Sequence, residues 1–149
     1  MTLDDPGVRG FLSDSWVARV ATRSPRGAPA LTPLWFVCDG GHLYAATAQA
    51  TLAARNVAAC PEVSILFDGE ARGRPPRCLR LRGRAVVHDA MPGWRVLARF
   101  AFKYYLGGAA SEIRHARLWG LRTRYYAQGQ IAVIDFVADG AEWLEPAPS

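Results

Sequence analysis

The sequence predicts a mainly antiparallel β domain that closes into a small barrel, with two or three helices. Three observations support this class. Short strand-like runs follow one another directly in the first third of the chain, tight-turn sequences separate them, and helical spacing of apolar residues appears at only a few places. Consecutive strands joined by short turns pair antiparallel, and about six or seven such strands can close on themselves.

The length and composition favour one domain. The chain has 149 residues, of which 50% are hydrophobic, which is enough for a single core. We therefore expect one domain over residues 1–149, with 1–10 and 140–149 peripheral or flexible. No apolar run is long enough to cross a bilayer, so we expect no membrane partner.

The charge and the cysteines narrow the class of protein further. The net charge of +5 permits a nucleic-acid partner, but no recognised binding module is visible, and we expect none. Cys38, Cys60 and Cys78 are odd in number and far apart, and no signal peptide is visible, which indicates reduced thiols in the cytoplasm. Neither cysteines nor histidines cluster as metal ligands do, so we expect no metal site.

Seven stretches have the composition of strands. One of them alternates Leu79 and Leu81 with Arg80 and Arg82, the pattern of a half-buried strand. The expected strands are 16–22, 28–37, 42–47, 62–67, 78–88, 120–126 and 131–136.

Turns and prolines organise the first strands. The sequence Ser24-Pro25-Arg26-Gly27 predicts one hairpin, and Asp39-Gly40-Gly41 predicts the next. Proline cannot donate to a ladder, so Pro29 and Pro33 indicate an edge or an irregular stretch near Pro33. Such an edge leaves backbone groups free to meet a ligand.

Helical patterns occupy the remaining stretches. In the longest one, an apolar face is expected from Trp94, Leu97, Ala98, Ala101, Tyr104 and Tyr105. The expected helices are 3–12, 51–56, a helix that opens at 89–92 and stops at Leu106-Gly107-Gly108, and a further turn or two within 110–117.

A candidate phosphate site lies where the third strand gives way to a helix. Thr47 ends the strand, Thr51 begins the helix and Arg55 follows one turn later. Helix N-termini attract anions, and a hydroxyl and a guanidinium nearby add donors. Two plainer readings stay open: Thr51 as a helix N-cap only, and Thr47 as an ordinary strand-end threonine.

The order of these motifs resembles the pyridoxamine-5′-phosphate-oxidase-like split β-barrels, which bind a flavin or, in actinobacterial branches, a deazaflavin. The resemblance extends from about Phe11 to about Phe136. It rests on 18–22, 33–36, 43–47, the sequence Ala54-Arg55-Asn56, 61–66, 81–85 and the pair Lys103-Tyr104.

The resemblance implies a split barrel of six or seven antiparallel strands with two or three peripheral helices. It further implies a homodimer with a cofactor at the subunit interface, either FMN or, as the alternative, the 8-hydroxy-5-deazaflavin coenzyme. Thr47, Thr51 and Arg55 then face the ribityl and phosphate end, and Lys103 reaches a phosphate across the dimer. The residues implied to border the ring are Val20, Ala21, Thr22, Pro33, Leu34 and Trp35.

Two features leave alternatives open. Family members often carry a lysine where this chain has Ala53, so Arg55, Arg72 or Arg74 must replace it, or the flavin binds weakly or not at all. Trp35 can serve as a cofactor wall or as core and dimer packing. The arginine series Arg80, Arg82 and Arg84 can be solvated, can pair with acids across the dimer, or can favour an anionic substrate.

The implied function is a flavin- or deazaflavin-dependent oxidoreductase that transfers hydride to or from a small conjugated or aromatic compound. No nucleophile–base pair is evident, so no catalytic residue is assigned. The absence of such a pair is consistent with an enzyme whose cofactor carries out the chemistry. The alternative is a non-catalytic protein that carries or senses flavin or haem.

Overall fold

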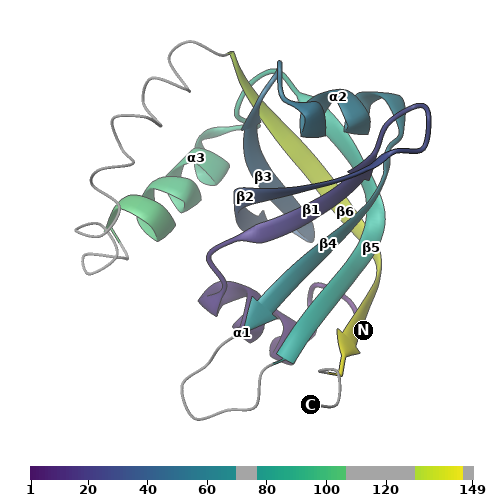
Figure 1. Ribbon diagram of the computed structural model, residues 1–149. Coiled ribbons are helices and arrows are strands. Elements are labelled where there is room, and N and C mark those ends of the chain that lie inside the picture. Colours follow the sequence, from purple (N-terminus) through teal and green to yellow (C-terminus); the bar gives the residue numbers. More distant parts are fainter. Residues whose placement is uncertain (70–76, 107–129, 146–149) are drawn as a thin grey trace.

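Six strands form a closed antiparallel barrel in the computed structural model, which describes residues 1–69, 77–106 and 130–145 (Figure 1). Around the barrel the order is β1-β2-β3-β6-β5-β4. The predicted class, mainly β with a few helices, is confirmed. The strands are β1 Ala18–Arg23, β2 Pro29–Asp39, β3 His42–Ala48, β4 Glu62–Gly69, β5 Arg77–His88 and β6 Ile131–Leu144.

Both predicted hairpins are present. Gly27 closes the β1–β2 turn at φ 83°, and its N–H donates to the Ser24 carbonyl at 2.8 Å. Gly40 and Gly41 form the two-residue β2–β3 turn at φ 57° and 81°. Both central residues of this turn type need positive φ, which glycine adopts without steric cost.

β2 changes partners along its length. Residues 29–34 pair with β1, and pairing with β3 begins at Trp35. The stretch that contains Pro29 and Pro33 therefore has no β3 partner on its other side, as the prolines predicted. This unpaired length of β2 is the split in the barrel wall.

β6 closes the barrel and is much longer than predicted. It pairs with β3 through residues 131–137 and with β5 through residues 133–144. The expected strand 131–136 therefore ended eight residues too early. The expectation that residues from 140 onward are peripheral or flexible is wrong for 140–144, because they pair with β5 and Trp143 packs edge-on against Phe11 at 5.0 Å.

The barrel core is apolar and follows strand alternation. On β2, Phe36 points inward and is 1% exposed, as expected for one of the pair Trp35 and Phe36. The largest fully buried side chains are Phe36, Phe67, Phe136, Leu43, Ile65, Leu79, Leu81, Ile134, Val8, Val20, Val57 and Val133.

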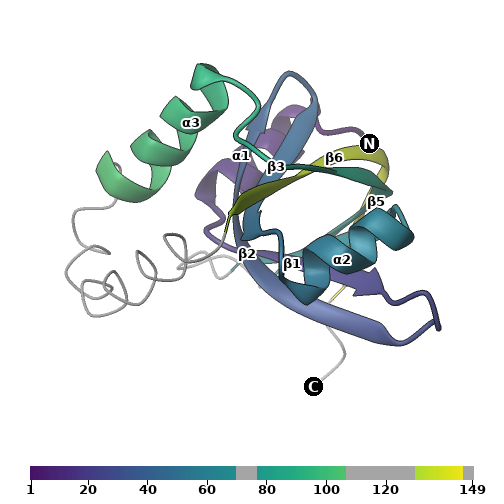
Figure 2. The ribbon, with the colours of Figure 1, turned by 90° about the horizontal axis from the view of Figure 1, so that it is seen from above.

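The helices lie outside the barrel. α1 (Pro6–Asp14) packs at one end and α2 (Leu52–Ala59) lies over the other, as Figures 1 and 2 show. α1 begins later than predicted, because the Asp5 carboxylate accepts from the Gly7 N–H at 2.9 Å and caps the helix. α2 extends three residues beyond the predicted 51–56. No helix in the described ranges is long and apolar enough to cross a membrane.

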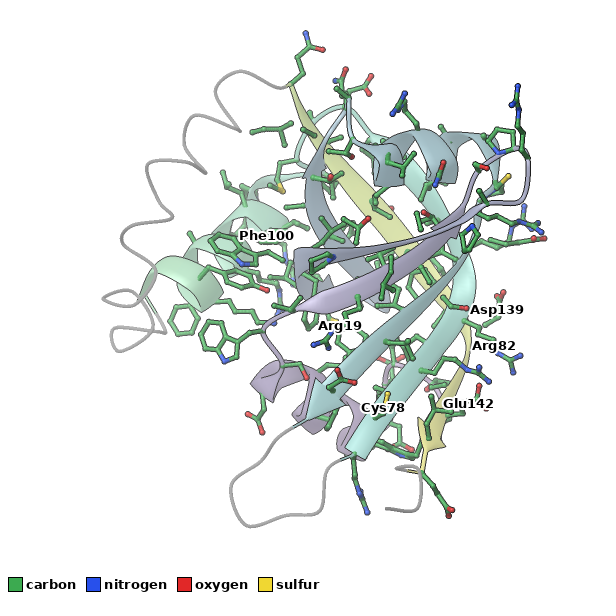
Figure 3. All side chains as sticks on the ribbon, in the orientation of Figure 1. Arg19, Cys78, Arg82, Phe100, Asp139 and Glu142 are labelled. Atoms are coloured by element: carbon green, nitrogen blue, oxygen red, sulfur yellow. The ribbon has the colours of Figure 1, made fainter. Side chains whose placement is uncertain are left out.

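The third helix, α3 (Trp94–Ala101), continues into a π-helical turn, η1 (Phe102–Leu106), and its predicted apolar face is wrong. Phe100 points to the barrel (Figure 3) and Val96 is buried with it, whereas Trp94 is 77% and Leu97 55% exposed. Tyr104 is buried, as expected. The helix also starts later than 89–92, after Gly93 at φ 105°.

Some predicted elements lie outside the described residues. These are the strand 120–126, the helical turns within 110–117, and Arg72 and Arg74, two of the candidate replacements for the missing lysine.

Candidate functional site

A hydroxyl pair lies where β3 ends and α2 begins. The Thr47 and Thr51 oxygens are 2.9 Å apart, Thr51 Oγ1 donates to the Ala48 carbonyl at 2.8 Å, and it accepts from the Ala54 N–H at 3.3 Å. A hydroxyl has one proton, so Thr47 is the donor within the pair. The structure thus joins the predicted residues Thr47 and Thr51 and confirms that Thr51 is the N-cap.

The start of α2 also offers free donors. The N–H groups of Leu52 and Ala53 precede the first intrahelical bond, from the Arg55 N–H to the Thr51 carbonyl at 3.1 Å, and neither has an acceptor in the described ranges. The Arg55 side chain is exposed and makes no ion pair with a described residue. These N–H groups and the guanidinium suit a phosphate, whereas the two hydroxyl protons are already directed to Thr51 Oγ1 and the Ala48 carbonyl.

Ala53 cannot be exchanged freely for the lysine that relatives often carry. It is 1% exposed and belongs to the main core cluster with Val57 and Val63. A lysine here would have to leave the core or bury its ammonium, which is costly. A phosphate bound here would therefore depend on Arg55 and on the α2 start.

Asn56 fixes α2 to the barrel. Its Nδ2 donates to Thr22 Oγ1 at 3.1 Å, and both side chains are buried. The partner of Asn56 is thus a side-chain hydroxyl of β1. Thr22 therefore holds the helix in place and has its side chain inside the fold.

The predicted ring-bordering residues divide by strand alternation. Val20 is fully buried and Leu34 packs on the core, so with Thr22 they present only backbone to the outside. Ala21 and Pro33 lie on the outer face, near the unpaired length of β2. A ligand on that face would meet two small side chains and exposed backbone.

Trp35 also points outward from β2, and Tyr104 covers it. The two rings stack with centroids 4.4 Å apart and planes 7° apart. The Tyr104 hydroxyl accepts from the Phe36 N–H at 2.9 Å and lies 2.9 Å from the carbonyls of both Phe36 and Trp16. This contact holds η1 on β2, so packing accounts for one face of Trp35.

Lys103 lies apart from the hydroxyl pair within one chain. Its Nζ donates to the Phe36 carbonyl at 3.3 Å and sits 3.6 Å above the Phe36 ring centroid. Burial lowers its pKa from 10.5 to about 8, and the neighbouring Cys38 partly opposes this. Burial likewise raises the pKa of the Cys38 thiol to about 11, against the attraction of Lys103 and Arg99.

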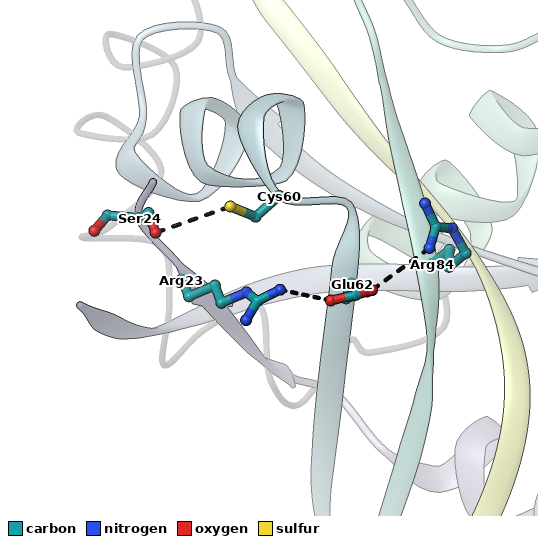
Figure 4. Close-up of polar contacts among 5 residues, drawn as sticks. All are labelled: Arg23, Ser24, Cys60, Glu62 and Arg84. Atoms are coloured by element: carbon teal, nitrogen blue, oxygen red, sulfur yellow. Dashed lines mark hydrogen bonds and ion pairs between the residues drawn. The ribbon is translucent and has the colours of Figure 1, made fainter. Parts of the chain in front are cut away.

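The arginine-rich strand pairs with acids of its own chain. Arg80 pairs with Glu142 on β6, and Arg82 also lies near this carboxylate (Figure 3). Arg84 and Arg23 flank Glu62 at 3.6 and 2.6 Å (Figure 4). These pairs are exposed and contribute little stability. The glutamates neutralise part of the arginine charge, which reduces the attraction for an anionic substrate.

One polar group was not predicted from the sequence. Asp135 Oδ1 lies 2.6 Å from His42 Nδ1, and its Oδ2 lies 3.0 Å from His88 Nε2. These residues come from β3, β6 and β5, which are neighbours only through barrel closure. Positions 42, 88 and 135 have no common spacing in the sequence that could have indicated this group. No set of described residues is arranged to bind a metal ion.

A split antiparallel barrel with a hydroxyl-capped helix start defines a known class of small domains. The model of the pyridoxamine 5′-phosphate oxidase family matches residues 5–123. The chain belongs to this family. No curated protein matches the sequence.

Solved structures with the same fold have diverged far in sequence. The conserved hypothetical protein Rv2991 from Mycobacterium tuberculosis matches with a TM-score of 0.71 and 18% identity over 100% of this chain and 92% of that one. The heme storage protein HutZ from Vibrio cholerae has a TM-score of 0.63 and 18% identity, over 95% and 94%. An F420 reductase has a TM-score of 0.62 and 17% identity, over 90% and 94%. At these identities the likeness shows the fold alone.

Proposed function

We propose that the chain is a homodimeric, FMN-dependent oxidoreductase whose cofactor phosphate binds at the start of α2. One observation carries this proposal: at the α2 start, which Thr51 caps, the N–H groups of Leu52 and Ala53 have no acceptor and Arg55 has no ion-pair partner among the described residues. Family membership supports it, since the resemblance already implied a flavin. The bound flavin would supply the hydride chemistry, and the chain would bind and orient it.

The rest of the cofactor would extend along the split. Residues 29–34 of β2 have no β3 partner, and Ala21 and Pro33 border this stretch with small side chains. The stacked pair Trp35 and Tyr104 lies at the end of this stretch. These residues would position the ring and help to exclude water from one side.

A dimer would complete the site. Several large apolar side chains are exposed, among them Trp94 at 77%, Phe102 at 68% and Val86 at 61%. Apolar surface of this kind is often covered by a partner. A second copy of the chain is the partner we propose, and Lys103 reaching a phosphate across that dimer remains a prediction.

Deazaflavin is the variant cofactor of this proposal. An F420 reductase is among the similar folds, and both cofactors have a phosphate-bearing tail that the α2 start would hold. We propose a small conjugated or aromatic compound as substrate and the cytoplasm as location.

A carrier or sensor for flavin or haem is the second candidate. Ala53 in place of the lysine removes one charge-assisted contact, worth about 1.5–3 kcal/mol, and weak retention would suit exchange. A protein titled as a heme storage protein shares the fold.

Purified protein reconstituted with FMN distinguishes the candidates. The oxidoreductase should acquire a flavin absorbance band that bleaches with a reductant and recovers, without oxygen, only when an acceptor substrate is added. A haem spectrum after reconstitution would favour the carrier. A protein that binds neither flavin nor deazaflavin would contradict the proposal.

A further inference from the structure

A cavity lies away from the α2 start, between α1, β2 and the α3–η1 segment. Its volume of about 460 Å³ falls within the range of about 300–1,000 Å³ that is usual for small-molecule sites. Apolar side chains line part of it and cationic side chains line another part. The apolar residues include Leu12, Trp16 and Phe102, and the cationic residues are Arg9, Arg99 and Lys103.

Lys103 is the single lysine of the sequence, and all other basic side chains apart from histidine are arginines. It lies in the π-helical turn η1, a rare geometry found often at functional sites. Its ammonium can donate three hydrogen bonds, and the described residues accept one, at the Phe36 carbonyl. Two donors therefore remain for whatever occupies the cavity.

The cations of this cavity outnumber their counterions. Arg99 pairs with Asp39 at 2.9 Å, and Asp39 also receives Arg95 at 3.5 Å. Among the described residues no carboxylate lies within ion-pair distance of Arg9 or Lys103. A largely buried ammonium without a counterion is unfavourable, and an anionic ligand would remove this cost.

We propose that this cavity binds a small organic anion, a carboxylate on an apolar body. The carboxylate meets Lys103 and Arg9, and the apolar body lies against Trp16, Leu12 and Phe102. Lysine provides a compact charge on a flexible stem, and the planar Arg9 guanidinium matches a carboxylate with two parallel N–H groups. The proposal requires neither a bound flavin nor a dimer.

The unique lysine permits a direct test. Reductive methylation with ¹³C-formaldehyde labels Lys103 and the N-terminus and retains their charge. Titration with 2-naphthoate should shift the Lys103 methyl signal in a saturable way, and the neutral analogue 2-naphthalenemethanol should bind more weakly. Calorimetry on the unlabelled protein should give the same dissociation constants.

Matched variants separate charge recognition from packing. Lys103→Met keeps the length of the side chain and should weaken 2-naphthoate binding tenfold or more, with little change for the alcohol. Arg26→Met, in the exposed β1–β2 turn, should change neither. Equal losses for both ligands in Lys103→Met, or an unshifted Lys103 signal, would overturn the proposal. If inorganic phosphate competed as strongly as 2-naphthoate binds, the proposal that the cavity recognises the apolar body of the ligand would be overturned.

Discussion

Lys103 is the residue at which binding and stability oppose each other. The unfolded chain holds its lysine proton up to a pKa of 10.5, whereas the folded chain releases it at about 8. Between these pH values the unfolded state binds more protons, so the free energy of unfolding rises with pH. Below pH 8 both states are protonated and the folded chain bears the whole cost of the buried charge.

We therefore predict that Lys103→Met removes the rise in the free energy of unfolding that Lys103 causes between pH 8 and 10.5. From pH 8 to 10.5 the wild-type chain should gain about 3 kcal/mol at most relative to the variant. Because Lys103 also lowers the pKa of the neighbouring Cys38, both proteins are compared in a Cys38→Ala background. Urea denaturation at several pH values measures this, and parallel pH profiles would show that the amine is not buried.

Single residues at the α2 start could be predicted in part. The hydroxyl at Thr51 before an apolar run indicated an N-cap, and the structure has it. The burial of Ala53 could not be predicted, because it depends on which side of α2 faces the barrel end. The same limit applies to Val20 and Thr22, whose inward direction follows from strand register and not from residue type.

At the scale of elements, the β5–β6 pair carries the tightest backbone contact. The register shifts between Arg82 and Gly83, and a Cβ added at Gly83 would lie 2.0 Å from the Val137 carbonyl oxygen. That oxygen belongs to the neighbouring strand and cannot move without disturbing the ladder. Only glycine allows β5 and β6 to approach this closely.

We predict that Gly83→Ala destabilises the fold by about 2–3 kcal/mol through this overlap. Gly140→Ala is the matched control, since Gly140 lies opposite Arg82 on β6 and an added Cβ would meet nothing within 4 Å. The control should change stability by less than about 0.5 kcal/mol. Denaturation midpoints compare the two, and equal effects would contradict the assigned register.

α3 shows why an amphipathic pattern alone did not give the buried face. Trp94, Leu97 and Ala101 satisfy helical spacing, but so do Val96 and Phe100, which lie on another side. Periodicity identifies a helix and does not say which of two apolar sides meets the sheet. Contact with β2 and β3 decides this, and it leaves Trp94 and Leu97 exposed.

At the scale of the whole molecule, turn sequences predicted the two hairpins, whereas the other strand pairs depend on closure of the barrel. The β1–β2 and β2–β3 pairs follow from turn residues. The β3–β6 and β1–β4 pairs join strands far apart in the sequence and follow only from closing the barrel. For this reason the prediction of the barrel depended on the family resemblance. The contact of Asp135 with His42 and His88 could not be predicted, because it depends on the same closure.

The exposed apolar residues predict that the chain assembles in pairs. Sedimentation equilibrium should give twice the chain mass of 16.3 kDa, with or without FMN. A monomer at micromolar concentration would contradict a cofactor site built by two subunits. It would leave the cavity at Lys103 unaffected, since one chain supplies all of its lining.

The central claim is that the α2 start holds a phosphate through Arg55 and the N–H groups of Leu52 and Ala53. The most direct measurement is the affinity of Arg55→Ala for FMN and for riboflavin, which lacks the phosphate, with Arg26→Ala as control. FMN binding should weaken about tenfold or more, because a charge-assisted contact is lost, while riboflavin binding and the control stay unchanged. Equal losses for FMN and riboflavin, or no loss for FMN, would contradict the account.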